Sequence, residues 1–305
     1  MKIKVGHCWP GRAGTEARPS EEKGFFSETG NWKPETISEF ELPVQQTTTG
    51  HRPLTTRMPS TIRFEAPLVP ARFRRREKRF LAEVDLPDGS RTWVHVPNSG
   101  ALTGCLFPGM EVLLTADGRP GRKTAYTWRF CRVDGGWISV DTTAPNRLVA
   151  ALLAGPGLPG LAPPLQVRRE VTLPHGGRLD FVVAKAGRLH FVEVKSITWV
   201  EDGVALFPDG VTSRGRRHLQ ELAALVKQGH GAWNIFVVQR QDARLMAPAQ
   251  QVDPAYAREL AAAAQAGVNL LAFATVVDPP TITLAEPLPV VLAGSEPGPD
   301  GTPWP

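Results

Sequence analysis

The stretch LDFVVAKAGRLHFVEVKS, residues 179–196, constrains the fold of this chain more than any other. Its pattern predicts two short strands joined by a two-residue Ala-Gly loop. With that loop, Asp180 lies directly opposite Glu193 at about 5 Å, where like charges repel each other. Glu193 and Lys195 share one face, because side chains alternate along a strand. Apolar residues occupy both faces, which predicts a sheet that is covered on both sides.

Two carboxylates and one ammonium group at the end of a covered sheet need a physical reason. A divalent cation that bridges Asp180 and Glu193 would supply one, because carboxylate oxygens are ligands for such ions. The alternative is that these side chains are solvated or form ordinary ion pairs, which contribute only about 0–1 kcal/mol when exposed. The register is also open at this point, since a slip of one residue turns every side chain to the other face.

The composition bounds the class of protein. A chain of 305 residues can hold two domains, and its net charge of +5 and pI near 9.3 favour a polyanionic partner. The three cysteines show no CxxC spacing and no neighbouring histidine cluster, which argues against a zinc site and a disulfide framework. No apolar run reaches the roughly 20 residues that span a bilayer, and the first residues lack a signal-peptide pattern. We therefore expect a cytoplasmic protein with no membrane partner.

The chain divides into four segments. Residues 1–57 are polar, rich in Gly, Pro, Thr and Glu, and without sustained periodicity, which predicts a disordered extension. Residues 64–141 hold short strands separated by turn residues, and about five such strands predict an OB-like β-barrel. Residues 143–292 mix helices and strands, and residues 293–305 are predicted to be a disordered tail.

The barrel segment carries a cluster of basic residues that we predict to contact DNA phosphates, as in barrels that bind single strands. The cluster consists of Arg72, Arg74, Arg75, Arg76, Lys78 and Arg79. Three aromatic residues in the neighbouring strands are candidates for stacking on bases, namely Trp93, Tyr126 and Trp128. The alternatives are ordinary: a run of charge is most often a solvated face, and an aromatic residue in a strand is most often part of the core.

The second domain is predicted to follow the order α-β-β-β-α-β-α-β, a mixed sheet with helices on both faces. Its last helix is expected to begin at an N-cap, Asp253. Its middle helix, predicted over 214–228, starts with the basic sequence RGRRH, from which we predict DNA contacts by Arg214, Arg217 and His218. Positive charge at a helix N-terminus opposes the helix dipole, and a bound phosphate would offset it. Simple surface basicity is the alternative.

An α-β-β-β-α-β core that carries D…E-x-K across its central hairpin resembles the PD-(D/E)XK nuclease superfamily. A wider set of sequence strings is more specific: PLVPARF at 67–73, PNSG at 97–100, GCLFPGMEV at 104–112, RLDF at 178–181, VEVKS at 192–196, EDGVALFPD at 201–209 and RGRRHL at 214–219. Together these strings resemble the sugar fermentation stimulation protein A (SfsA) family over residues 64–292. The resemblance implies an OB-like β-barrel followed by a PD-(D/E)XK nuclease-like domain.

The resemblance also implies roles for individual residues. Asp180 and Glu193 would be the ligands of Mg²⁺ or Mn²⁺, with Glu170 on the preceding strand as a weaker third candidate. Lys195 would position or activate the attacking water, which makes Asp180, Glu193 and Lys195 the implied catalytic set. Gln239, near the end of a later strand, would touch the edge of this site. No small-molecule cofactor is expected.

Two functions follow from these features. The first is a DNA-binding protein of the sugar fermentation stimulation type that is a divalent-metal-dependent DNA phosphodiesterase, a nuclease. The alternative is a non-catalytic, largely sequence-nonspecific DNA-binding regulator of sugar (maltose) metabolism genes, and a remoter one is an RNA-binding protein that uses the barrel alone. In the first two cases the partner is single- or double-stranded DNA, held mainly through its phosphate backbone by salt-sensitive contacts.

Overall fold

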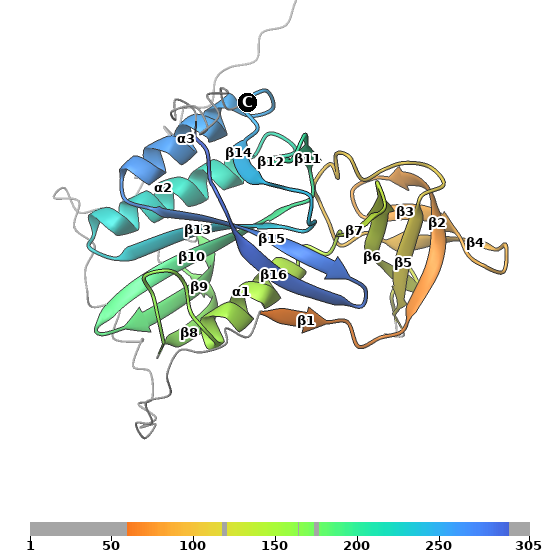
Figure 1. The fold of residues 1–305 in the computed structure, drawn as a ribbon, viewed down its shortest axis with the longest axis horizontal. Coiled ribbons are helices and arrows are strands. Elements are labelled where there is room, and N and C mark those ends of the chain that lie inside the picture. The colour runs from red at the N-terminus through yellow and green to blue at the C-terminus, as the bar shows by residue number, and fades with distance from the viewer. Residues whose placement is uncertain (1–59, 118–120, 164, 174–176, 293–305) are drawn as a thin grey trace, which may run out of the picture. The chain divides into compact units, whose positions relative to one another are not determined.

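The computed structural model describes residues 60–292 apart from three internal gaps, 118–120, 164 and 174–176. The extension predicted over residues 1–57 and the tail predicted over residues 293–305 lie outside these described residues. The described part belongs to one compact unit and contains an all-β domain followed by a mixed α/β domain (Figure 1). The fold class predicted from the sequence, an OB-like barrel followed by a nuclease-like mixed sheet, is thereby confirmed.

The first domain is a barrel whose described strands form a six-stranded sheet in the order β4-β3-β2-β5-β6-β7. A further pairing of His95 with Thr127 joins β4 to β6 and closes the sheet. The strands are β2 (Leu68–Glu77), β3 (Leu81–Asp85), β4 (Arg91–His95), β5 (Glu111–Ala116), β6 (Tyr126–Val133) and β7 (Gly136–Ser139). Closure removes the free sheet edges at which strands of other chains would otherwise pair.

The basic segment RFRRRE, which holds most of the basic cluster, is part of strand β2. Ala71 and Phe73 point into the barrel core, while Arg72 and Arg74 are exposed. This alternation is the period of a half-buried strand. Strand β2 therefore displays its arginines on the barrel surface and pairs with β3 in a hairpin.

Two of the aromatic residues that were candidates for base stacking, Trp128 and Trp93, are buried or partly buried in the barrel. Trp128 is fully buried, its ring lies 5.2 Å from that of Phe73, and its indole N–H donates to the Phe130 carbonyl at 2.8 Å. Trp93 is partly buried beneath the Arg75 guanidinium, which lies 5.0 Å from the ring centroid. Trp128 is thus a core residue, and a base cannot reach it.

The second domain is built on a seven-stranded sheet in the order β1-β16-β15-β13-β10-β9-β8. Strands β10, β13 and β15 run parallel to one another, and the other neighbours pair antiparallel. The strands are β1 (Thr61–Arg63), β8 (Gln166–Thr172), β9 (Arg178–Lys185), β10 (Arg188–Ile197), β13 (Gly231–Val238), β15 (Asn269–Asp278) and β16 (Thr281–Leu288). Every residue of β13 is buried, as expected for a parallel strand covered on both faces.

Helices cover the two faces of this sheet, as predicted. Side chains of α1 (Ala144–Ala154) share a core cluster with Val192 and Val194 of β10. The side chains that alternate with these valines, Glu193 and Lys195, lie against His218 of α2 (Ser213–Lys227) instead. Helix α3 (Pro254–Gln265) packs beside α2 (Figure 1), and it begins at the predicted N-cap Asp253, whose carboxylate accepts from the Tyr256 N–H at 2.9 Å.

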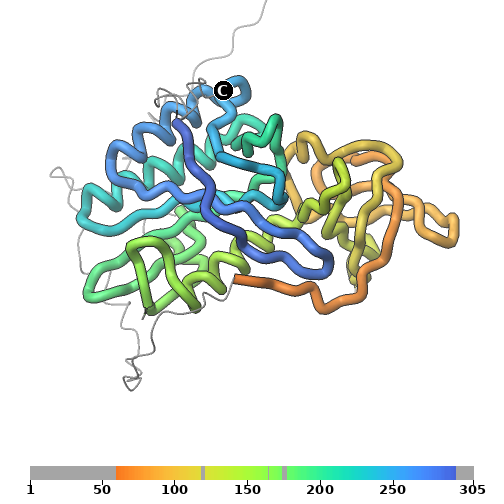
Figure 2. Tube along the Cα trace, viewed as in Figure 1, coloured from red at the N-terminus to blue at the C-terminus, as the bar shows by residue number. Residues whose placement is uncertain are grey.

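Strand β1, strand β16 and a small additional sheet of this domain were not predicted from the sequence. Strand β1, which precedes the barrel, pairs with β16 at the end of the domain, with Ile62 opposite Ile282. Figure 2 shows these two segments, orange and blue, running side by side. A small sheet of β11 (Val200–Glu201), β12 (Val204–Phe207) and β14 (Leu245–Pro248) lies beyond the end of β10. The chain thus leaves the second domain's sheet, forms the barrel, and returns.

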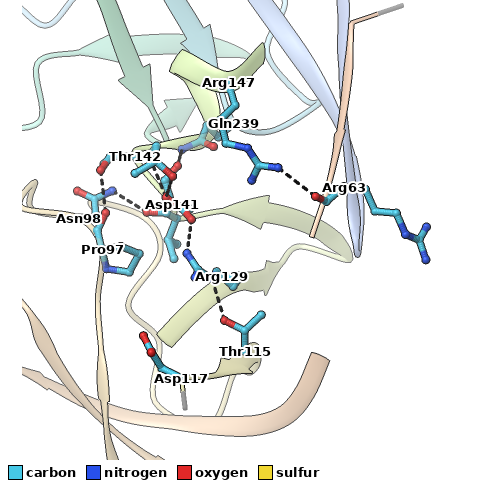
Figure 3. A network of polar contacts seen from close by, with 12 residues as sticks. Arg63, Pro97, Asn98, Thr115, Asp117, Arg129, Asp141, Thr142, Arg147 and Gln239 are labelled. Carbon is cyan, nitrogen blue, oxygen red and sulfur yellow. Dashed lines mark hydrogen bonds and ion pairs between the residues drawn. The ribbon is translucent and has the colours of Figure 1, made fainter. Parts of the chain in front are cut away.

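A buried carboxylate, Asp141, joins the two domains where the barrel ends and α1 begins (Figure 3). Its side chain, 1% exposed, accepts from the Arg129 guanidinium and from the N–H and hydroxyl of Thr143 at 2.8 and 2.7 Å. The backbone carbonyl of Asp141 accepts from the Gln239 amide at 3.1 Å, and that amide also donates to the Ser196 hydroxyl at 2.9 Å. Asp141 therefore fixes the barrel against the end of β10.

A second contact between the domains involves the loop of the PNSG string. The Asp209 carboxylate of the second domain accepts from the Leu102 N–H of this loop at 3.1 Å. From the barrel side, Arg76 donates to the carbonyls of Asn98 and Gly100 at 2.6 and 2.7 Å. A Cβ atom on Gly100 would lie only 2.6 Å from Asp209 Oδ2, so a larger residue here would force the Asp209 carboxylate to move.

We expect Gly100→Ala to lower the free energy of unfolding by about 1–3 kcal/mol, the usual cost of an added methyl group in a tightly packed place. The extra carbon would push Asp209 off the Leu102 N–H. Gly210→Ala is the matched control, because a Cβ there meets nothing within 4 Å. Urea unfolding of the two variants measures the difference, and equal stability would show that Asp209 does not hold this loop.

Candidate active site and nucleic-acid interface

The central hairpin has the register that the sequence predicted. Pairing runs from Arg188 opposite Lys185 to Val192 opposite Phe181, so Asp180 and Glu193 occupy the next position along the two strands. The two loop residues have φ of +50° and +76°, which is the conformation of a tight hairpin turn and suits the Ala-Gly sequence. Local turn chemistry thus sets which side chains meet at the far end of the hairpin.

Asp180 is partly buried at the start of β9 and accepts two hydrogen bonds. Oδ1 accepts from the Asn146 amide of α1 at 2.7 Å, and Oδ2 accepts from the Val194 N–H at 2.8 Å. Burial raises the pKa of the Asp180 carboxyl, and the negative charge of Glu193 raises it further. The two hydrogen bonds and the charge of Lys195 oppose this shift without cancelling it. A carboxyl group whose ionisation is opposed by burial and by a neighbouring carboxylate is one whose charged form a cation would stabilise.

Glu193 is 4% exposed and lies at the centre of a buried polar cluster. Its Oε1 accepts from the Lys195 ammonium at 2.7 Å and also contacts His218 Nδ1. The Lys195 nitrogen lies 3.3 Å from the same ring nitrogen. Burial alone would raise the pKa of Glu193, but the charge of Lys195 and the contact with His218 outweigh it and hold the pKa below its usual range. The structure therefore brings Glu193 and Lys195 together with a third group.

That third group, His218, was predicted to contact DNA from the start of the basic helix. Helix α2 begins after the N-cap Thr212, whose hydroxyl accepts from the Gly215 N–H at 3.0 Å. This start turns His218, Leu219 and Leu222 toward the sheet, and His218 is only 2% exposed. Its ring lies against Glu193 and away from solvent, so in this structure it orients a carboxylate. The sequence signal was its position on the apolar face of the helix.

Glu170, the weaker metal candidate, lies beside Asp180 on β8 but points into solvent. Its neighbours pair with β9 in a regular register, yet its own φ is +54° and its side chain is 72% exposed. Its carboxylate lies 3.8 Å from the Arg178 guanidinium. Within the residues that the structure describes, no three His, Cys, Asp or Glu side chains form a group that could hold a metal ion. The candidate metal ligands that meet are thus the pair Asp180 and Glu193.

The basic residues of the barrel fall into two sets. Those on the outer face of β2 are engaged with acids of the same barrel: Arg74 contacts Asp85 and Arg75 contacts Glu83, each at 2.9 Å. Arg72, on the same strand, donates to a loop carbonyl at 3.3 Å. The second set consists of Arg76, Lys78 and Arg79, which line a cleft between the barrel and the second domain. Burial lowers the pKa of Arg76 against the attraction of Asp209.

The basic residues at the start of α2 also have different partners. Arg216 is paired with the buried carboxylate of Asp253 at 2.8 Å, and Arg214 lies against the outer nitrogen of the His218 ring at 3.4 Å. Arg217 is exposed and lies 3.6 Å from Glu221 one turn further on. Of the residues predicted to contact DNA from this helix, Arg214 and Arg217 are the ones on the surface.

The cleft between the domains has a volume of about 580 Å³. One wall comes from the barrel and the other from the end of β10 and the loop between β12 and α2. Ser196, which directly follows Lys195, is part of the lining, and so is the N-cap Thr212 of the helix that carries His218. The cleft therefore lies beyond the carboxyl end of β10, and Glu193 and Lys195 lie within β10 near that end.

We expect Asp180→Asn to change how stability depends on pH in metal-free buffer. Because the folded pKa of Asp180 is raised, the native state binds more protons than the unfolded chain, and wild-type stability falls as pH rises from the ordinary value of 3.8 through the folded value. Asparagine removes this loss, and its amide retains partners if the Asn146 amide turns over. The variant should therefore gain stability relative to wild type between acidic and neutral pH.

Urea midpoints at a series of pH values measure this difference. Asp88→Asn is the control of opposite sign, since hydrogen bonds from Ser90 hold the pKa of Asp88 below its usual range. At pH values above those at which carboxyl groups titrate, Asp88→Asn should lower the free energy of unfolding, whereas Asp180→Asn should not. A loss of stability in the Asp180 variant at neutral pH would contradict the expected penalty of the carboxylate pair.

The fold and the site define a class: a two-domain protein in which an OB-like barrel precedes a nuclease-like sheet with Asp180, Glu193 and Lys195 at its centre. Residues 75–140 match the family described as "SfsA N-terminal OB domain", and residues 143–281 match "Sugar fermentation stimulation protein RE domain". The chain belongs to the sugar fermentation stimulation protein (SfsA) family. No helix among the described residues is long and apolar enough to cross a membrane.

Individual relatives extend over both domains. The sugar fermentation stimulation protein homolog of Citrifermentans bemidjiense is 42% identical over 226 residues, which are 74% of this chain and 98% of that protein. The homolog of Geobacter sulfurreducens is 44% identical over 228 residues, 75% of this chain and 97% of that protein. Among solved structures, Pyrococcus furiosus SfsA in complex with Ca²⁺ is 26% identical and matches with a TM-score of 0.70, covering 77% of this chain and 100% of that one.

Proposed function

We propose that this protein is a divalent-metal-dependent DNA phosphodiesterase. One observation carries the proposal: a carboxylate pair and a lysine, Asp180, Glu193 and Lys195, lie together at the covered end of the central sheet. A protein that only binds has no use for such a pair, because the charge of Glu193 raises the cost of ionising Asp180. A partly buried carboxyl group whose pKa is raised by a charged neighbour is typical of functional sites.

The donor set fits a hard divalent cation such as Mg²⁺ or Mn²⁺. Asp180 and Glu193 supply carboxylate oxygens, and Mg²⁺ in phosphoryl-transfer sites is usually held by one or two carboxylates together with substrate phosphates and water. A relative of known structure is described in complex with Ca²⁺, which is also a hard, oxygen-seeking ion. When bound, such an ion polarises the scissile phosphate and lowers the pKa of its water.

The chain's own residues supply positioning and charge. Lys195, whose side chain is 11% exposed, places an ammonium group in a site largely closed to water, where it orients the attacking water or stabilises charge that develops on the phosphate. His218 contacts the same oxygen of the Glu193 carboxylate as Lys195 does. The basic residues of the barrel and of the start of α2 hold the DNA strand through its phosphates, with an affinity that falls as salt rises.

A non-catalytic DNA-binding protein, with a regulatory role in sugar metabolism, is the second candidate. It is favoured by the state of Glu193, whose Oε1 is already engaged by Lys195 and by His218. The described residues also bring no third carboxylate to the pair. In this candidate the three buried groups neutralise one another, and DNA is held by the basic surface alone.

Purified protein incubated with end-labelled single-stranded, duplex and branched DNA separates the two candidates. The nuclease is expected to cut at least one of these substrates with Mg²⁺ or Mn²⁺, to stop in chelator, and to lose cutting with Asp180→Asn while binding is retained. DNA binding without cutting under every metal condition would establish the second candidate. Cutting that survives Asp180→Asn would remove the assigned site from the reaction.

A further inference from the structure

The cleft between the domains is built from sequence strings that the proposed chemistry does not use. Its lining includes the PNSG loop of the barrel and the FPD turn that follows β12. Lys195 itself does not line it, but the next residues, Ser196 to Thr198, form one wall. In open α/β sheets, ligands bind in the crevice beyond the carboxyl ends of the strands, where these residues lie.

The charge of the cleft is positive. Three cations and one carboxylate line it, and that carboxylate, Asp209, is engaged with the Leu102 N–H. Arg76 is engaged with loop carbonyls, but the side chains of Lys78 and Arg79 form no ion pair or hydrogen bond with any described residue. They contrast with Arg74 and Arg75 on the same hairpin, which are both paired with acids. Two unpaired cations at the rim are suited to a phosphate.

The other walls suit a base. Trp199, Leu206 and Phe207 line the cleft with apolar residues, and the polar residue Ser99 lines it as well. A volume of about 580 Å³ is within the roughly 300–1,000 Å³ of sites that enclose small organic ligands. A base pair with both its backbones is far larger than such a ligand. Enzymes that act on a nucleotide in a pocket of this kind take it from a single strand or out of the stack.

We infer that this cleft binds one unpaired nucleotide of a DNA strand, next to the phosphate presented to Lys195. The preferred substrate is therefore single-stranded DNA, with its backbone on Lys78 and Arg79 and its base against the apolar wall. This inference rests on the proposed function and adds the substrate class to it. Single-stranded preference through a basic groove and a stacking surface is typical of OB-type barrels, and here the second wall comes from the nuclease-like domain.

The test measures binding alone, in chelator, so that no strand is cut. Fluorescence anisotropy compares a labelled single-stranded oligonucleotide with a blunt duplex of the same length, using the full chain. We expect the single strand to bind about tenfold tighter, which corresponds to the 1–3 kcal/mol that one stacked base contributes. Equal or tighter binding of the duplex would overturn the inference.

Two variants place a carboxylate in the cleft from opposite walls, Arg79→Glu and Gly210→Glu. Gly210 has open space at its Cβ position, so this change adds charge without a clash. Arg63→Glu is the matched control for Arg79→Glu, since it makes the same two-unit change of charge on β1, away from the cleft lining. Gly210→Glu changes the charge by one unit, so the control overstates its general electrostatic effect. Both cleft variants should reduce the affinity for the single strand about tenfold and reduce affinity for the duplex no more than the control does. Equal losses in all three variants would overturn the inference.

Failure of this inference is distinguishable from failure of the proposed function. If wild-type protein prefers the single strand and the cleft variants lose that preference, the cleft is assigned even where no DNA is cut. If DNA is cut with metal, but single strand and duplex bind equally and Arg79→Glu behaves as the control, the nuclease stands and the cleft assignment falls.

Discussion

Lys195→Ala is expected to slow DNA cleavage by about 100- to 1,000-fold, the usual loss when one preorganised electrostatic group is removed from a transition state. The ammonium group is held 2.7 Å from Glu193 and 3.3 Å from His218, in a position fixed by the strand. A water molecule cannot replace it with the same orientation. Cleavage of labelled DNA under single-turnover conditions measures the chemical step directly.

The affinity for DNA should change little in the same variant. The Lys195 side chain is 11% exposed and already bound to a carboxylate, so it contributes little to the long-range attraction of phosphates. Lys185→Ala is the matched control, because it removes the same charge from the other end of the same hairpin, where the ammonium group contacts the Ala162 carbonyl. A parallel loss of binding and cleavage in Lys195→Ala would mean that this residue binds substrate and has no role in the chemical step.

The central hairpin could be predicted because all of the information about it is local. A two-residue turn sets the register, and a period of two sets the face, so Asp180 was correctly placed beside Glu193 and Glu193 on the same face as Lys195. The N-cap Asp253 is local in the same sense, since its carboxylate bonds to an N–H three residues away. The alternation of Ala71 and Phe73 with arginines in β2 was also present in the sequence, but the positive charge obscured it.

The parts that could not be predicted depend on contacts between distant residues. Strand β1 is three residues long, too short to show a period, and its partner β16 follows more than 200 residues later. The direction of the Glu170 side chain depends on a positive φ at Glu170 itself, and a positive φ is normally predicted only where the sequence has glycine. The basic cluster of the barrel was predicted to be one DNA-binding surface. The pairing of β2 with β3 places Asp85 and Glu83 beside Arg74 and Arg75, so these two arginines form ion pairs within the barrel instead.

The basic start of α2 was predicted correctly, but the contact of His218 with Glu193 was not. The basic helix was expected from RGRRH, and the helix is there, but its rotation about its own axis decides which side chains face the sheet. That rotation is set by Leu219 and Leu222, which are fully buried against the sheet beside His218. The cluster of three polar groups therefore arises from packing, and it places two cationic or polar partners on a single buried carboxylate oxygen.

Glu193→Ala is expected to lower the free energy of unfolding by about 3–5 kcal/mol, the cost of removing one partner from a buried ion pair. Lys195 and His218 would remain in the space between β10 and α2 without their carboxylate. Glu193→Gln should cost less, since its amide oxygen can still accept from the ammonium group. Urea unfolding at neutral pH measures both variants, and an unchanged slope with denaturant would show that the same transition is being followed.

The double variant Glu193→Ala/Lys195→Met separates the charge effect from the packing effect. If the loss in Glu193→Ala comes from a stranded buried cation, then replacing that cation with an apolar side chain of similar length should return part of the lost stability. If the loss comes from the missing carboxylate volume, the double variant should be less stable than either single variant. We expect the first result, because Glu193 is 4% exposed and the ammonium group beside it has no other carboxylate within hydrogen-bonding distance among the described residues. The same buried charges that the proposed cleavage requires would then account for the largest single cost to the fold when only one of them is removed.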